Sequence, residues 1–142
     1  LRDVIAFLEM SEMPTEVVVT ADGTDLSQPG AQSECGQTHP AVGQSLTFST
    51  NAHQVAGVAT IVDDCTIALD DFSFDGGGID VRLYGGSGGS FDLNLSVNMV
   101  GMAFDGSSAF VRLPAGVTLD DFDSMSVWCV PVGFDFGSGS FE

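Results

Sequence analysis

Short apolar runs separated by Gly and Asp turns constrain the fold of this chain more than any other feature of its sequence. Phe72 and Phe74 share one face at the two-residue period of a strand, and Asp75-Gly76-Gly77-Gly78 follows as the strongest turn signal. Regular turns and almost no helical periodicity predict an all-β antiparallel sandwich, immunoglobulin-like or barrel-like, with little helix. The expected strands from residue 53 onward are 54–62, 65–69, 72–74, 79–84, 91–100, 109–113 and 124–130, with a flexible connection at 85–89.

The first 52 residues have a different pattern. We expect a strand at 16–20, a turn at 21–25, a polar loop at 27–43 and a short strand at 46–49, while residues 2–10 suit either a helix or a strand. No linker divides the chain, so we expect one domain over 1–142, in which 1–52 adds strands and a loop to a β core at 53–142.

The charge of the chain excludes several classes of partner. Its 142 residues carry 20 Asp and Glu against three Arg and no Lys, which gives a net charge of −17. A protein needs clustered cations to bind a phosphate backbone or an anionic membrane surface. We therefore expect no nucleic-acid partner, and an anionic membrane is an equally poor one. No stretch has the length of a transmembrane helix. Protein partners or self-association are the expected interactions.

The first residue is Leu1 rather than Met. We therefore expect that an N-terminal piece has been removed, and that the protein is secreted or held at the cell surface. Three cysteines fit that compartment as one disulfide and one free thiol. Closing Cys35 to Cys65 or Cys65 to Cys129 stabilises the fold by roughly 3–4 kcal/mol in either case, so loop entropy leaves the pairing open.

A set of positions from His53 onward combines a Trp-Cys segment with a Phe-x-Phe-Asp-Gly turn. These positions are His53, Val55, Gly57, 67–69, Asp71-Phe72, Phe74-Asp75-Gly76, Gly78, Asp80, Tyr84, Leu113-Pro114, Leu119, Asp121, Val127-Trp128-Cys129 and Phe136-Gly137. With them, the segment from His53 to Phe141 resembles the DM-thirteen domain, which occurs in Skeletor-type animal proteins and in secreted bacterial proteins, often near DOMON domains. The combination of the two motifs is what makes the resemblance specific.

The resemblance implies a β-rich extracellular domain that takes part in electron transfer. The cysteine of the family falls on Cys129, which is then a bare redox thiol or a ligand to a prosthetic group such as haem. Cys35 lies outside the matched region and Cys65 is not expected as a family cysteine. The resemblance therefore implies a local Cys35–Cys65 pair.

The residues themselves allow two interpretations of Cys129. A redox thiol needs partial exposure and a stabilised thiolate, and no cation lies near it in the sequence. Alternatively, Cys129 is a small buried hydrophobe that shares a strand face with Met125 and Val127, with Trp128 packing beside it. His53 is a candidate second ligand at the start of a strand, or a histidine that simply hydrogen-bonds to loop backbone.

Asp-rich turns make calcium a second candidate ligand. Carboxylate and carbonyl oxygens of such turns suit calcium, and the candidate ligands are Asp22, Asp25, Asp75 and Asp80. The alternative is a solvated acidic surface that protects strand edges from pairing. No full EF-hand loop is present.

Hydrolase motifs are lacking: the Gly-x-Ser-x-Gly pattern at 85–89 is not followed by an expected helix, as a nucleophile elbow requires, and the sequence has no His-Glu-x-x-His. Two hypotheses follow. The first is an extracellular electron-transfer accessory domain in which Cys129 is the redox or ligand group and Trp128 packs beside it in the cofactor site. The second is a non-enzymatic structural or adhesive surface module, stabilised by calcium and self-associating, in which Cys129 is inert.

Overall fold

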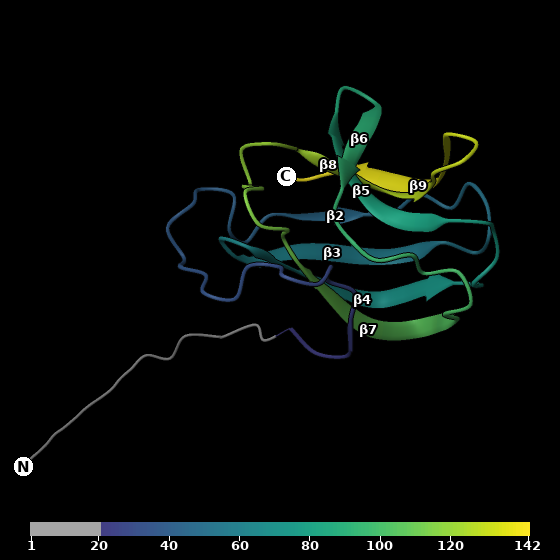
Figure 1. Ribbon diagram of the computed structural model, residues 1–142, viewed down its shortest axis with the longest axis horizontal. Coiled ribbons are helices and arrows are strands. Elements are labelled where there is room, and N and C mark those ends of the chain that lie inside the picture. Colours follow the sequence, from purple (N-terminus) through teal and green to yellow (C-terminus); the bar gives the residue numbers. More distant parts are fainter. Residues whose placement is uncertain (1–20) are drawn as a thin grey trace, which may run out of the picture.

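Gly and Asp turns divide the described part of the chain, residues 21–142, into nine strands in the computed structural model (Figure 1). The expected segments 2–10 and 16–20 lie outside the described residues. The strands are β1 (Thr24–Asp25), β2 (Ser45–Thr47), β3 (Ala56–Asp63), β4 (Thr66–Phe74), β5 (Val81–Ser87), β6 (Ser90–Asn94), β7 (Phe104–Arg112), β8 (Ser124–Cys129) and β9 (Phe134–Ser140).

Two sheets form a sandwich, which confirms the predicted fold class. One sheet has the order β1-β7-β4-β3-β2 and the other the order β6-β5-β8-β9. All pairings within them are antiparallel except that of β1 with β7. The short strands β1 and β2 belong to the same sheet as β3, β4 and β7, and side chains from both sheets share one hydrophobic core. The hairpin of β5 and β6 projects from the top of the molecule in Figure 1.

Strand β4 is longer than the sequence predicted, because Asp70 and Asp71 do not end it. Leu69 and Phe72 are both fully buried although they are three positions apart, which a regular strand of period two does not allow. A β-bulge between them, with Asp71 at φ 51°, restores the alternation and leaves both aspartates exposed. Phe72 and Phe74 then face the core together, as predicted.

The expected connection at 85–89 is wrong for residues 85–87, which belong to β5, and only Gly88 and Gly89 form a turn. Gly85 and Gly86 are buried. A Cβ atom at Gly85 would lie 2.9 Å from the ring of Phe122, so glycine serves close packing here rather than flexibility.

Other boundaries also differ from the expectation. Strand β6 ends at Asn94 instead of continuing to Val100, and residues 24–25 pair with β7 instead of forming only a turn. Strand β9 was not predicted, because the last four of its seven residues are Gly and Ser, which carry no apolar pattern. No helix with the length and apolarity needed to cross a membrane occurs among residues 21–142.

Candidate functional site

Cys129 lies in the core at one end of the sandwich. It is 4% exposed, it pairs in register with Val81 of β5 and Phe134 of β9, and it faces inward with Met125 and Val127. The predicted strand face of Cys129 is therefore observed. Since a redox thiol must be reachable, this burial favours the inert alternative over an exposed thiol.

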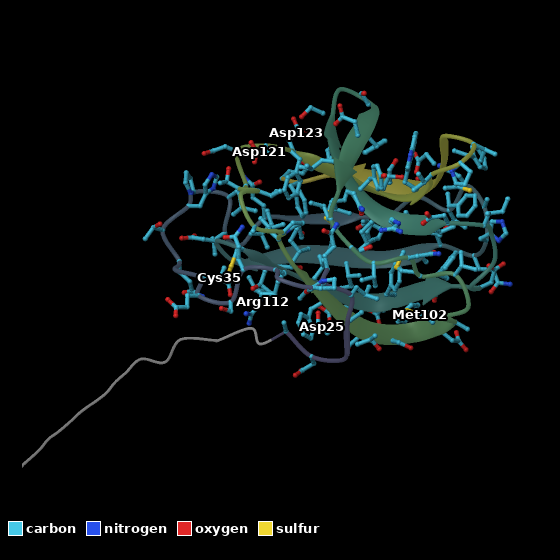
Figure 2. All side chains as sticks on the ribbon, in the orientation of Figure 1. Asp25, Cys35, Met102, Arg112, Asp121 and Asp123 are labelled. Carbon is cyan, nitrogen blue, oxygen red and sulfur yellow. A yellow bond between two sulfur atoms is a disulfide. The ribbon has the colours of Figure 1, made fainter. Side chains whose placement is uncertain are left out.

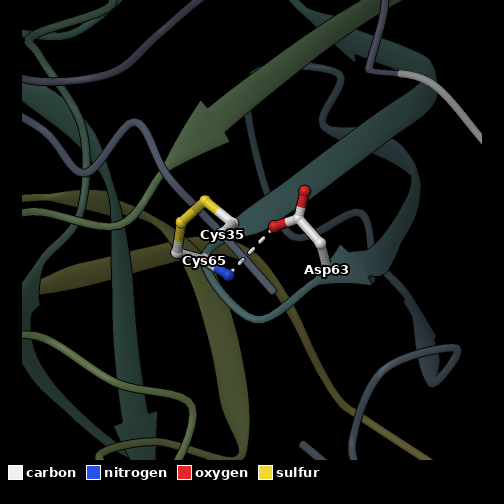
Figure 3. Close-up of side chains that lie close together, drawn as sticks. All are labelled: Cys35, Asp63 and Cys65. Atoms are coloured by element: carbon white, nitrogen blue, oxygen red, sulfur yellow. Dashed lines mark hydrogen bonds between the residues drawn. A yellow bond between two sulfur atoms is a disulfide. The ribbon is translucent and has the colours of Figure 1, made fainter. Parts of the chain in front are cut away.

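A disulfide joins Cys35 and Cys65, whose Cα atoms are 5.5 Å apart (Figure 3). Asp63 accepts a hydrogen bond of 3.0 Å from the Cys65 amide through Oδ1. The two sulfurs and a carboxylate oxygen of Asp63 lie within 4.8 Å of one another, the spacing of a metal site. Because the sulfurs are bonded to each other, they offer no thiolate to a cation in this oxidised form.

His53 is held by Asp75 at the same end of the sandwich as Cys129. Its Nδ1 lies 2.9 Å from Oδ1 of Asp75, and its ring packs on the buried Phe136 with centroids 4.3 Å apart. A Cβ at Gly77 would lie 2.8 Å from this Nδ1, so only glycine lets the imidazole approach the turn. The amide of Gly77 and the His53 imidazole both lower the pKa of Asp75 below its ordinary value.

The backbone at His53 is in a conformation that side chains rarely adopt. His53 has φ 54° and Gln54 has φ 62°, two consecutive non-glycine residues in the left-handed region. Each costs on the order of 1 kcal/mol, and such outliers gather at functional sites. The imidazole is 35% exposed, and Nε2 makes no hydrogen bond to the described part of the chain.

A second histidine forms a similar pair at the opposite end. His39 Nε2 lies 2.8 Å from Oδ1 of Asp120, and its Nδ1 accepts a hydrogen bond from the Ala41 amide. Figure 2 shows the two ends: Cys35, in the loop that also carries His39, is labelled at one end, and Met102, whose backbone lies beside Gly76, at the other. Both ring nitrogens of His39 are occupied, so His39 has no nitrogen left for a ligand.

The four aspartates proposed as calcium ligands are separated and partly used. Asp75 binds His53 and Gly77, Asp80 pairs with Arg82 at 2.7 Å, and Asp25 accepts a hydrogen bond from the Ser27 amide. Within residues 21–142, no three acidic side chains of these turns approach one another at the spacing of a metal site. The structure thus does not bring Asp22 and Asp25 together with Asp75 and Asp80.

Trp128 lies on the outer face of the second sheet, half-buried, because it alternates with Val127 and Cys129. Two aromatic residues that the sequence analysis did not assign to a site lie beside it. The ring of Tyr84 is 6.3 Å away and that of Phe91 is 5.6 Å away, measured between centroids. Their signal in the sequence was weak, since lone aromatic residues in strands usually serve the core.

Residues 47–141 match the family described as electron transfer DM13. The chain belongs to the DM13 family. This result confirms the resemblance and widens its range from 53–141 to 47–141. A cytochrome b561, DM13 and DOMON domain-containing protein of Arabidopsis thaliana is 33% identical over 110 residues, which cover 73% of this chain and 12% of that protein. No solved structure matches the chain significantly.

The matched DM13 region contains every residue of the His53 end of the sandwich. His53, Asp75, Phe136 and Cys129 lie within 47–141, whereas Cys35 and His39 lie before it. The disulfide therefore ties a loop outside the matched region to the DM13 sandwich through Cys65. The sequence analysis identified His53 as a candidate but assigned Asp75 to calcium. The signal for their contact was the Asp75-Gly76-Gly77 turn, in which a carboxylate is followed by glycines that leave room for a neighbouring side chain.

Proposed function

We propose that this chain is an extracellular electron-transfer accessory domain in which His53, oriented by Asp75, is the contact for a haem group. The observation that carries the proposal is the Nδ1–Oδ1 bond of 2.9 Å, with Nε2 left exposed on a ring packed against Phe136. When one ring nitrogen of a histidine donates a hydrogen bond to a carboxylate, the proton stays on that nitrogen. The other nitrogen is then unprotonated and can bind a metal.

The two candidate ligands differ in how well they fit such a group. His53 fits, because its side chain is 35% exposed and its Nε2 is unshared within the described residues. Cys129 does not fit as a haem ligand in this conformation, since it is 4% exposed and packed between the sheets. A haem bound at His53 would supply the one-electron chemistry that protein side chains lack.

The compartment is part of the proposal. The Cys35–Cys65 disulfide supports an oxidising location such as the cell surface or the extracellular space. The DM13 family and the b561- and DOMON-containing relative support a role beside other redox domains. We infer protein partners of that class for this chain.

A haemin titration followed by the Soret band tests the proposal. We expect His53→Ala to weaken haemin binding about tenfold or more, while His39→Ala leaves it unchanged. His39 is the matched control because it makes a His–Asp pair of nearly the same length at the other end of the molecule. Equal binding by wild type and both variants would contradict the proposal, since it would show that haemin adheres to apolar surface.

The alternative function, a structural or adhesive module, is favoured by the burial of Cys129. Counting thiols on the oxidised protein separates the two roles of this residue. We expect one thiol, which reacts only after denaturation. A thiol that reacts in the native protein would return Cys129 to the candidate ligands.

A further inference from the structure

The outer face of the sheet β6-β5-β8-β9 carries a small aromatic platform. Trp128 and Tyr84 are inclined by only 29°, with centroids 6.3 Å apart, so their rings are offset rather than overlapping. Phe91 closes one side at 5.6 Å and 48°. All three side chains are half-buried, and each therefore keeps part of its surface in contact with water.

A shallow pocket of about 260 Å³ adjoins the platform, and polar groups surround it. Asp135 is fixed there by hydrogen bonds from the hydroxyls of Ser126 at 2.7 Å and Ser138 at 2.6 Å. The Gly137 amide donates a third bond at 2.9 Å. Because a carboxylate has about four acceptor positions, Asp135 can still accept a bond from a ligand hydroxyl. The residues that line the pocket with Trp128, Phe91 and Asp135 are Gly89, Ser124, Ser138, Gly139 and Ser140.

This combination has the chemistry of a sugar site. One face of a sugar ring presents C–H groups, which pack on an aromatic face, and its edge presents hydroxyls, which both donate and accept. An aromatic floor beside a fixed carboxylate and serine hydroxyls meets both requirements. A purely apolar partner would leave Asp135 desolvated without a new hydrogen bond, at a cost.

The net charge of the molecule favours neutral sugars over anionic ones. The net charge of −17 repels anionic glycans. Arg82, the cation that the described residues place on this face, is already paired with Asp80 at 2.7 Å. Uncharged glycans meet no such repulsion.

We propose that the Trp128 platform binds a neutral oligosaccharide, with Trp128 and Tyr84 stacking on ring faces and Asp135 accepting hydroxyl hydrogen bonds. This proposal is independent of the electron-transfer function, because it uses the outer face of β8 and not the His53 end. It adds a surface that carries neutral glycans to the expected partners of the domain.

Isothermal titration with cellohexaose, chitohexaose and xylohexaose as probes tests the proposal. We expect at least one to bind, with Trp128→Ala and Tyr84→Ala each weakening binding about tenfold or more. Trp128→Phe keeps a ring and should retain part of the affinity. Since Trp128 is the sole tryptophan of the chain, its fluorescence in the wild type should shift on binding.

Phe134→Ala is the matched control. Phe134 is an aromatic residue of the same sheet that is 48% exposed, but it packs on Phe136 instead of beside Trp128 and does not line the pocket, so its loss should leave binding unchanged. Thermal unfolding of each variant shows whether it is folded. No binding by any of the three probes, binding that survives Trp128→Ala, or binding only to the anionic glycan heparin would each overturn the proposal.

Discussion

At the scale of single residues, Gly137 shows how closely β9 approaches the connection between β2 and β3. Its backbone has no left-handed conformation, yet a Cβ atom there would collide with the Ser49 carbonyl and with Val55. We expect Gly137→Ala to lower the free energy of unfolding by about 1–3 kcal/mol, because the added methyl forces the backbones apart. Urea unfolding measures the change.

Gly88→Ala is the comparison for that prediction. Gly88 has φ 63° and open space around its Cα atom, so alanine costs only the backbone strain, about 1 kcal/mol. A smaller loss of unfolding free energy at Gly137 than at Gly88 would show that the connection between β2 and β3 moves away from β9 without strain.

Asp75 makes the fold sensitive to acid. Its pKa is lowered by the Gly77 amide and by His53, so the native state holds the carboxylate in its charged form more strongly than the unfolded chain does. This stabilisation is complete above the ordinary value of 3.8 and is lost as the pH falls below it towards the lowered pKa. We expect Asp75→Asn to flatten the decline of stability below pH 3.8, measured by urea unfolding at several pH values.

Asp92→Asn is the control for the acid titration. Asp92 is exposed, and its carboxylate accepts no hydrogen bond from the described residues. Its replacement should leave the shape of the acid limb unchanged. If both variants gave the same curve as the wild type, Asp75 would not contribute to the loss of stability in acid.

At the scale of elements, the disulfide links the loop before β2 to the turn between β3 and β4. It closes a loop with a sequence separation of 30 residues. By loop entropy we expect the double variant Cys35→Ala, Cys65→Ala to lose about 3–4 kcal/mol of unfolding free energy. Cys129→Ala removes a buried sulfur without breaking a crosslink, and should cost about 1 kcal/mol. Equal losses would contradict a stabilising crosslink.

The strands themselves were predictable where apolar alternation was strong. The hairpin of β3 and β4 and the inward pair Phe72 and Phe74 followed from pattern alone. Strand β9 and the Gly85-Gly86 part of β5 were not predicted. Gly137 of β9 packs against Ser49 and Gly85 packs against Phe122, and both partners are distant in sequence. A local pattern cannot show which distant group will approach a backbone.

The candidate site was predictable only in part for the same reason. His53 and Cys129 were chosen by residue type and family resemblance, and both lie at one end of the sandwich. His53 and Asp75 are 22 positions apart in the sequence, and their hydrogen bond requires a residue without a side chain at Gly77. No sequence spacing indicates that contact.

At the scale of the whole molecule, the net charge of −17 opposes compaction. Salt screens the repulsion, so we expect the melting temperature to rise with sodium chloride at low ionic strength. Calcium and magnesium chloride at equal concentrations should raise it equally, because no acidic cluster among the described residues favours calcium. A distinctly larger rise with calcium would contradict this expectation and support the calcium-stabilised module.

The alternation of β8 gives the molecule two adjacent reporters on opposite sides of one strand. Trp128 fluoresces from the outer face, and the thiol of Cys129 is sealed between the sheets. Thiol labelling and fluorescence therefore follow two different events. If the two sheets separate before β8 loses its neighbouring strands, Cys129 will react while the emission of Trp128 stays native. That order of events would show that the sandwich unfolds by separation of its sheets and not in a single cooperative step.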